Sequence, residues 1–179
     1  RNNIKIPFKD IDDVKKAYNF SNLESFLKIY YEGAKVLVKE QDFFDLTWEY
    51  VLKCKENNIV HTEIFFDPQT HTDRGINFNT VINGIYEALK KAQKEFNLSF
   101  KIIMCFLRHL DEDSCFKILD EAIIHKNKIF GVGLDSSETG NPPEKFKKLF
   151  KKASENNFVT VAHAGEEGPP EYIWEALNL

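Results

Sequence analysis

Apolar residues recur at helical spacing through the first third of the chain. A stripe within positions 21–38 predicts a helix with one buried face, and Ser21 with Glu24 three residues later predicts its capping box. The same spacing predicts a second helix that ends near residues 56–58. We therefore expect residues 11–57 to form a helical insertion. The stripes consist of Leu23, Phe26, Leu27, Tyr30, Tyr31, Ala34 and Val38 in the first helix, and Leu46, Tyr50, Val51 and Cys54 in the second.

The pattern changes after residue 57. Short β-branched or aromatic runs predict four strands, and an amphipathic segment follows each of them. The runs lie at 58–68, 100–108, 129–135 and 158–166. Strand and helix alternating at steps of about 30 residues are typical of βαβ units. Residues 58–179 are therefore expected to form βα repeats with a parallel sheet that is covered on both faces.

Two short runs show that successive units are built alike. Gly-Asn-Pro-Pro-Glu at 140–144 and Glu-Gly-Pro-Pro-Glu at 167–171 each stand between a strand end and a helix start. Proline suits the first turn of a helix, and a glutamate there suits the positive end of the helix dipole. This regularity favours a (βα)8 barrel, of which the chain covers about four units. A doubly wound sheet stays open as an alternative, because four strands cannot show whether a sheet closes.

Polar residues follow all four predicted strands. Because the reactive groups of parallel α/β folds lie just past the carboxyl ends of the strands, these residues are candidates for one site. They are also costly to bury without a partner. The strand-end residues are Asp67, then Arg108 and His109, then Asp135 to Glu138, and finally His163 and Glu166.

His163 and Glu166 form the sharpest group. A neutral imidazole at the end of an apolar strand can bind a metal ion, and Gly165 permits a turn that brings Glu166 back toward it. A metal ligand beside a carboxylate that moves protons is what metal-assisted hydrolysis needs. The alternative is a buried histidine hydrogen-bonded to Glu166. His-x-x-Glu alone does not decide between them.

The other polar residues favour structural roles. His61 and His109 are interpreted as hydrogen-bonded core or rim residues. Arg108 is interpreted as a fork donor to buried carboxylates or carbonyls, such as those near Glu63 or Asp67. The chain has no Gly-x-Gly-x-x-Gly, Walker or Gly-x-Ser-x-Gly motif, so dinucleotide, P-loop and serine-hydrolase chemistry are not indicated.

The composition limits the kinds of partner that the chain is expected to bind. The 179 residues carry a net charge of −4, so they show no basic surface for nucleic acid or an anionic membrane. Three cysteines without Cys-x-x-Cys spacing suggest reduced thiols in the cytoplasm, and no apolar run is long enough to span a membrane. The chain begins with Arg1, and its apolar pattern continues to Leu179. We therefore expect it to be part of a single domain that is truncated at both ends.

Five stretches resemble the adenosine and adenine deaminase family, zinc hydrolases with a (βα)8 barrel. The resemblance covers essentially the whole chain and implies that it holds barrel strands two to five with a helical insertion. The matching stretches are residues 19–50, TEIFFDPQTHTDRG (62–75), CFLRHL (105–110), GVGLDSSETGNPPEKF (131–146) and VAHAGEEGPPEYIWEAL (161–177).

The resemblance also implies roles for the two sharpest candidates. His163 is similar to the family's third zinc-binding histidine, and Glu166 to the acid that protonates purine N1. In that chemistry zinc lowers the pKa of its water, the hydroxide attacks C6, and ammonia leaves. The family's His-x-His pair, its remaining histidine and its Asp-Asp pair belong to strands outside these residues. One ligand cannot build a four-coordinate zinc site, so we expect the 179 residues alone to be inactive.

The fourth-strand end distinguishes branches of the family. Adenosine deaminases have Leu-Ala-Gly-Asp after the aspartate, whereas this chain has Ser136-Ser137-Glu138 after Asp135. That run resembles the microbial adenine deaminases, which act on the free base. The resemblance assigns substrate contacts to Asp135, Ser137, Glu138 and Gly165. Glu138, where the other branch has glycine, is expected to narrow the ribose pocket.

The expected function is zinc-dependent deamination of adenine to hypoxanthine and ammonia, in purine salvage. The expected cofactor is one Zn²⁺ per site, and the expected partner is a small purine. Three alternatives remain: an adenosine deaminase, a deaminase of another purine, and a non-catalytic βα scaffold that binds a small molecule. The sequence does not indicate the oligomeric state.

Overall fold

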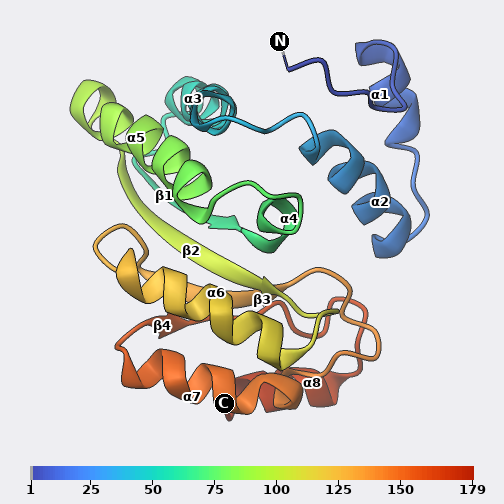
Figure 1. Ribbon diagram of the computed structural model, residues 1–179, viewed down its shortest axis with the longest axis vertical. Helices are drawn as coiled ribbons and strands as arrows, with labels where there is room; N and C mark the ends of the chain where they lie inside the picture. Colours follow the sequence, from blue (N-terminus) through green and yellow to red (C-terminus); the bar gives the residue numbers. More distant parts are fainter. Residues whose placement is uncertain (1) are drawn as a thin grey trace.

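The structure, a computed structural model, describes residues 2–179 and contains a four-stranded sheet (Figure 1). Its strands are β1 (His61–Phe66), β2 (Ser99–Leu107), β3 (Gly131–Asp135) and β4 (Val159–Thr160). They are hydrogen-bonded in chain order, and every neighbouring pair is parallel, which confirms the predicted sheet. Phe66 pairs with Met104 and Leu107 with Asp135, so the carboxyl ends of the first three strands lie at one edge.

Long helices form a layer on one face of the sheet (Figure 1). They are α3 (Glu40–Glu56), α5 (Phe78–Phe96), α6 (Glu112–Ile124) and α7 (Lys147–Glu155). The shorter elements are α1 (Ile11–Ala17), α4 (Gln69–Thr72), the 3-10 helix η1 (Pro143–Phe146) and α8 (Pro170–Leu177). Both η1 and α8 have proline in the first turn, as the two Pro-Pro-Glu runs predict.

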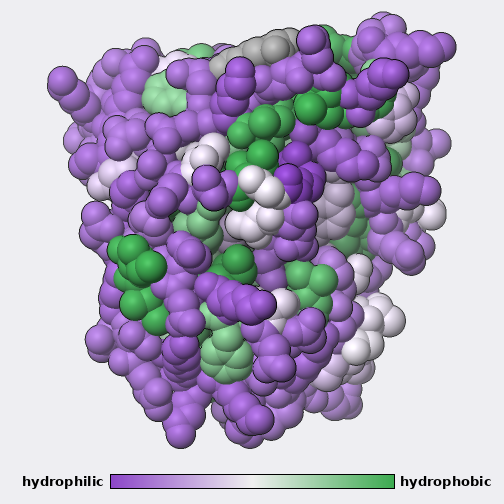
Figure 2. Space-filling view, viewed as in Figure 1, coloured by the Kyte–Doolittle hydropathy of each residue, from purple (hydrophilic) through white to green (hydrophobic). Residues whose placement is uncertain are grey.

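The core lies between the sheet and this helical layer. Its fully buried side chains include Ile82, Leu89, Ile102, Met104, Leu119, Leu134 and Leu149. Figure 2 shows that the outer, helical face is mostly hydrophilic. At β1 the two faces differ, because Phe66 is buried while its neighbour Phe65 is 51% exposed. The prediction of a sheet covered on both faces therefore fails at the edge strand β1, whereas consecutive residues of β2 are buried from Ile102 to Leu107, so both faces of that strand are covered.

Helices α3 and α5 pack closely, because α5 has a glycine where it faces α3. A Cβ atom added to Gly84 on α5 would lie 2.3 Å from the carbonyl oxygen of Glu40 and 2.7 Å from Cβ of Phe43. Only glycine permits this approach without a shift. Helix α3 ends at Glu56, as its periodicity predicts, and belongs to the outer layer.

The remaining helix, α2 (Leu23–Ala34), differs from the expectation. Its capping box is formed by Asn22 and Ser25, not by Ser21 and Glu24, because the side-chain oxygens of Asn22 and Ser25 each accept a backbone N–H of the other. None of its residues is fully buried. The predicted buried face is therefore wrong, and this apolar face lines a pocket instead.

The three cysteines, Cys54, Cys105 and Cys115, are free and buried, as expected for reduced thiols. Over residues 2–179, none of the helices combines the length and the apolar character that a membrane span requires.

Candidate active site

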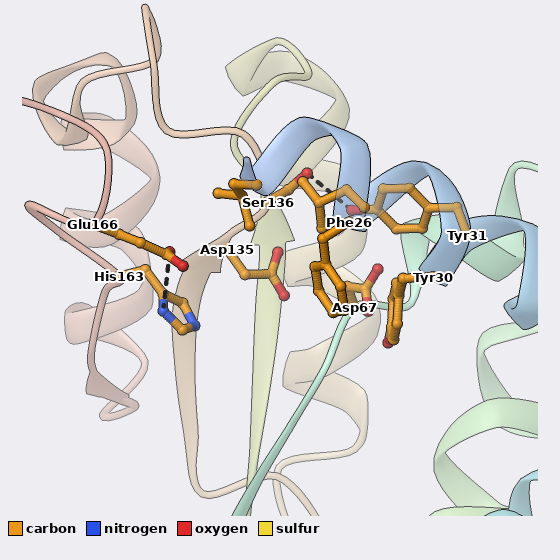
Figure 3. A pocket seen from close by; sticks show the side chains of 10 residues that line it. Phe26, Tyr30, Tyr31, Asp67, Asp135, Ser136, His163 and Glu166 are labelled. Carbon is orange, nitrogen blue, oxygen red and sulfur yellow. Dashed lines mark hydrogen bonds and ion pairs between the residues drawn. The ribbon is translucent and has the colours of Figure 1, made fainter. Parts of the chain in front are cut away.

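A pocket lies beyond the carboxyl ends of the strands and is closed on one side by α2 (Figure 3). The strand ends supply its polar side chains, and α2 supplies an apolar and aromatic wall. The lining residues are Leu23, Phe26, Leu27, Tyr30 and Tyr31 of α2, with Asp67, Asp135, Ser136, His163 and Glu166. The structure thus brings together residues from the ends of β1 and β3 and from the segment after β4.

His163 and Glu166 lie close together on one side of this pocket (Figure 3). The His163 backbone N–H donates to the carbonyl oxygen of Leu134 at 3.1 Å, so the ladder of β3 and β4 continues to the histidine. Nδ1 of His163 lies 3.9 Å from Oε2 of Glu166, and both side chains are about half exposed, at 47% and 48%. The alternative of a buried histidine hydrogen-bonded to Glu166 is therefore wrong. Both groups are open to a ligand.

Asp67, which follows β1, and Asp135, at the end of β3, project into the same space (Figure 3). Burial raises the pKa of Asp67 to about 6, and the hydroxyl of Thr70 donates to its carboxylate. Burial and then the nearby Asp67 charge raise the pKa of Asp135 well above its ordinary value. Oδ1 of Asp135 is buried and has no hydrogen-bond partner among the described residues. A ligand with an N–H group would satisfy it.

The wall formed by α2 is the part of the pocket that sequence reasoning missed. Phe26, Leu27 and Tyr30 present an apolar surface against which an aromatic ring can pack. The hydroxyl of Tyr31 donates to Oγ of Ser136 at 2.9 Å. Burial raises the pKa of both tyrosines, so they are neutral at pH 7. The signal was present as the aromatic stripe, but its periodicity predicts an apolar face without showing what covers it.

Three of the four predicted substrate contacts, Ser137, Glu138 and Gly165, do not line this pocket, whereas Asp135 does. Ser137 borders a neighbouring depression between α2 and His109. Glu138 is fully buried and does not line the pocket. The expectation that Glu138 narrows a ribose site is corrected, because both of its carboxylate oxygens accept backbone N–H groups instead.

Gly165 lies between His163 and Glu166 with φ of +77°, in the left-handed region. A Cβ atom here would also lie 2.6 Å from Cδ1 of Ile173. Glycine is therefore required at this turn for two separate reasons.

Arg108 has the structural role predicted for it, but with different partners. Its guanidinium donates to the carbonyl oxygens of Asn141 and His163 and lies 3.7 Å from Glu138, not near Glu63 or Asp67. His109 is a rim residue, as expected, and its Nδ1 contacts Oγ of Ser136 at 2.9 Å.

The pocket offers an incomplete set of metal ligands. No group of three or more histidine, cysteine, aspartate or glutamate side chains within residues 2–179 is arranged to hold a metal ion. His163 is the imidazole that faces the pocket. One histidine can supply one ligand, and a four-coordinate zinc site needs more donors than that.

The fold and the site define an α/β protein with its reactive groups at the carboxyl ends of parallel strands. The chain belongs to the adenosine deaminase family, whose model matches residues 1–179. It is 59% identical, over all 179 residues, to an adenine deaminase of Acinetobacter baylyi and covers 54% of that protein. The chain thus spans about half the length of the curated relatives it matches.

Solved structures agree with this assignment. The crystal structure of adenine deaminase from Arthrobacter aurescens matches 99% of the chain, and 54% of its own chain is covered, with a TM-score of 0.95 and 44% identity. An amidohydrolase from Burkhoderia ambifaria with bound zinc matches 79% of the chain, and 40% of its own chain is covered, with a TM-score of 0.76 and 28% identity.

Proposed function

We propose that the full-length protein that carries this chain is a zinc-dependent adenine deaminase, which hydrolyses adenine to hypoxanthine and ammonia. The observation that carries the proposal is the open pair of His163 and Glu166, 3.9 Å apart, in a pocket with an aromatic wall. The similarity of the whole chain to adenine deaminases supports it.

The likeness to these relatives also supports a (βα)8 barrel, in which the four strands would be staves two to five. Residues 1–179 would form part of one catalytic domain, with residues 11–57 as a helical part and 58–179 as βα repeats. The parallel order of β1 to β4 and the repeated Pro-Pro-Glu helix starts fit this arrangement.

His163 would bind the zinc ion through its imidazole, together with ligands from outside this chain. A zinc ion bound there supplies a Lewis acid and an activated water. The half-exposed imidazole fits this role, because a ligand must reach its nitrogen atoms. The zinc-bound relative supports zinc as the metal.

Glu166 would act on the purine. As a general acid, its carboxyl group donates a proton to N1 while the water adds to C6, and its exposure to the pocket lets the ring approach. Phe26, Leu27 and Tyr30 would hold the ring and exclude bulk water. The unpartnered oxygen of Asp135 would accept an N–H of the base. Gly165 would let the turn place Glu166 beside His163.

The test compares ammonia release from adenine and adenosine by the full-length wild-type protein and its variants. Glu166→Gln keeps the size of the side chain but removes the acidic proton, so turnover of adenine should fall by roughly 10²–10⁴-fold while zinc stays bound. His163→Ala should lose zinc as well as activity. Glu171→Gln, which changes an exposed carboxylate on α8, is the matched control and should behave as wild type.

The outcomes separate the alternatives. Faster release from adenosine would assign the protein to adenosine deaminases and contradict the adenine proposal. Full zinc occupancy and full turnover in His163→Ala would show that His163 is not a ligand. A protein that releases ammonia from neither purine, and binds no zinc, would support a non-catalytic scaffold.

A further inference from the structure

Glu138 is the most completely enclosed carboxylate of the strand-end region, with no exposed surface. It lies three residues after β3, yet its partners are in the segment after β4. Oε1 accepts the backbone N–H of Gly165 at 2.6 Å, and Oε2 accepts those of Glu167 at 2.7 Å and Gly168 at 2.9 Å. The three donors lie on both sides of Glu166. One side chain therefore fixes the backbone from which Glu166 projects.

The segment that carries Glu166 has no regular secondary structure. Helix α8 begins only at Pro170, and the last ladder hydrogen bond is the one from the N–H of His163. Between these points the carboxylate of Glu138 accepts the backbone hydrogen bonds that a neighbouring strand or a helix would otherwise accept. It also packs closely, because a Cβ atom added to Gly168 would lie 3.1 Å from Cδ of Glu138.

Arg108 balances the buried charge. Its Nη1 lies 3.7 Å from Oε1 of Glu138 and donates to the carbonyl oxygen of His163 at 2.6 Å. Its Nε and Nη2 donate to the carbonyl oxygen of Asn141 at 2.9 Å and 2.6 Å. A buried carboxylate is stable when it is paired and its lone pairs accept hydrogen bonds, and Glu138 meets both conditions. An amide could not replace it, because its NH₂ group would face a backbone donor.

We propose that Glu138 is a positioning residue of the deamination reaction, which acts through Glu166 by holding residues 165–168 in place, with Arg108 as its counter-charge. This inference rests on the proposed function. It assigns Glu138 no contact with the purine, in contrast to the role expected from the sequence. Glu138 then affects the reaction of the base and the metal only through the residues that it orients.

A double-mutant cycle in the full-length protein tests the proposal. Displacement of a reacting group by about 1 Å can cost ~10²-fold in rate. Glu138→Gln should therefore lower kcat for adenine by about that factor, with KM for adenine and bound zinc close to wild type. In the Glu166→Gln background the same change should cost less than about threefold, since the group it positions is already disabled.

Three further readouts distinguish positioning from loss of fold or from substrate contact. Glu138→Asp keeps the charge and should recover part of kcat, and the amide protons of residues 165–168 should exchange faster in Glu138→Gln than in wild type. The ratio of adenine to adenosine turnover should stay unchanged in both variants. Glu171→Gln again serves as the control.

Four results would overturn the inference. They are a fully active Glu138→Gln, equal costs of Glu138→Gln in both backgrounds, a rise in KM for adenine without a change in kcat, and a changed preference between adenine and adenosine. If Glu138→Gln does not fold, Glu138→Asp carries the same cycle. A slow Glu166→Gln with a fully active Glu138→Gln rejects only this inference, whereas a fully active Glu166→Gln rejects the proposed function.

Discussion

Tyr31 on α2 donates a hydrogen bond of 2.9 Å to Oγ of Ser136, which follows β3 directly. None of the residues of α2 is fully buried, so packing alone holds this helix weakly. The bond to Ser136 is one of the polar contacts that keep the helix over the pocket. Ser136 itself has φ of +72°, a left-handed conformation that non-glycine residues adopt at a cost. The hydrogen bond therefore joins a weakly packed helix to a strained strand end.

Removing this hydroxyl should loosen α2. Tyr31→Phe is expected to lower the free energy of unfolding by about 1 kcal/mol and to raise KM for adenine, since the helix forms one wall of the pocket. Tyr18→Phe, at an exposed ring, is the control and should change neither quantity. Urea denaturation and steady-state kinetics measure the two effects. An unchanged KM would show that α2 keeps its place without this bond.

Gly165→Ala should be more harmful than Gly140→Ala. Both glycines have φ near +77°, at +77° and +76°, so each substitution introduces backbone strain of roughly 1–2 kcal/mol. Gly140 faces open space, whereas a Cβ atom on Gly165 meets Ile173 at 2.6 Å. Thermal denaturation should therefore show the larger loss for Gly165→Ala, and Ile173→Ala should relieve part of it. Equal losses would contradict the described contact.

Two helical glycines offer a similar comparison. Gly84→Ala would force α5 away from α3, because its Cβ atom would lie 2.3 Å from the carbonyl oxygen of Glu40, and should cost about 1–3 kcal/mol. Gly33→Ala on α2 meets nothing within 4 Å and should stabilise the protein by roughly 0.5–1 kcal/mol. Denaturant midpoints decide the signs. A stabilising Gly84→Ala would refute the close packing of these helices.

His71 should make stability depend on pH. Burial, and then the Arg74 charge beside it, lower its pKa to about 4. The unfolded chain takes up a proton near pH 6.5, whereas the folded chain does so only near pH 4. The contribution of neutral His71 to the free energy of unfolding is therefore fully present above about pH 6.5. As the pH falls from there to about pH 4, this contribution decreases by on the order of 1.4 kcal/mol per pH unit.

The His71→Gln variant isolates this effect, because glutamine does not titrate. Its unfolding free energy should be flatter than that of wild type between pH 6.5 and pH 4 when measured in urea. The edge-on contact between the His71 ring and Phe43 explains why the imidazole stays enclosed. Parallel pH profiles of the two proteins would show that another group causes the loss.

The strand order could be predicted from the sequence, whereas the orientation of single side chains could not. Repeated alternation of strand and helix constrains a chain to parallel neighbours, so β1 to β4 follow from periodicity alone. The same periodicity gives α2 an apolar face, but it cannot tell a core from the wall of a pocket. That distinction depends on what lies opposite the helix, which local spacing does not encode.

The partners of Arg108 and Glu138 show the same limit. The sequence indicates that both stand at strand ends, and a fork donor near carbonyls and carboxylates is found as predicted. Their mutual contact joins the loops after β2 and β3, and it depends on the register of β2 against β3, which no motif contains. His163 and Glu166 were easier to predict, because they are three residues apart on one turn.

The carboxylate of Glu138 makes the loop after β3 and the loop after β4 depend on each other. A glutamate in the first loop has its partners only if the second loop turns its backbone N–H groups inward, and those groups are satisfied only if the first loop brings the acid. Related proteins should therefore change both loops together over evolutionary time. An engineer who transfers one of them to a new scaffold must transfer the other.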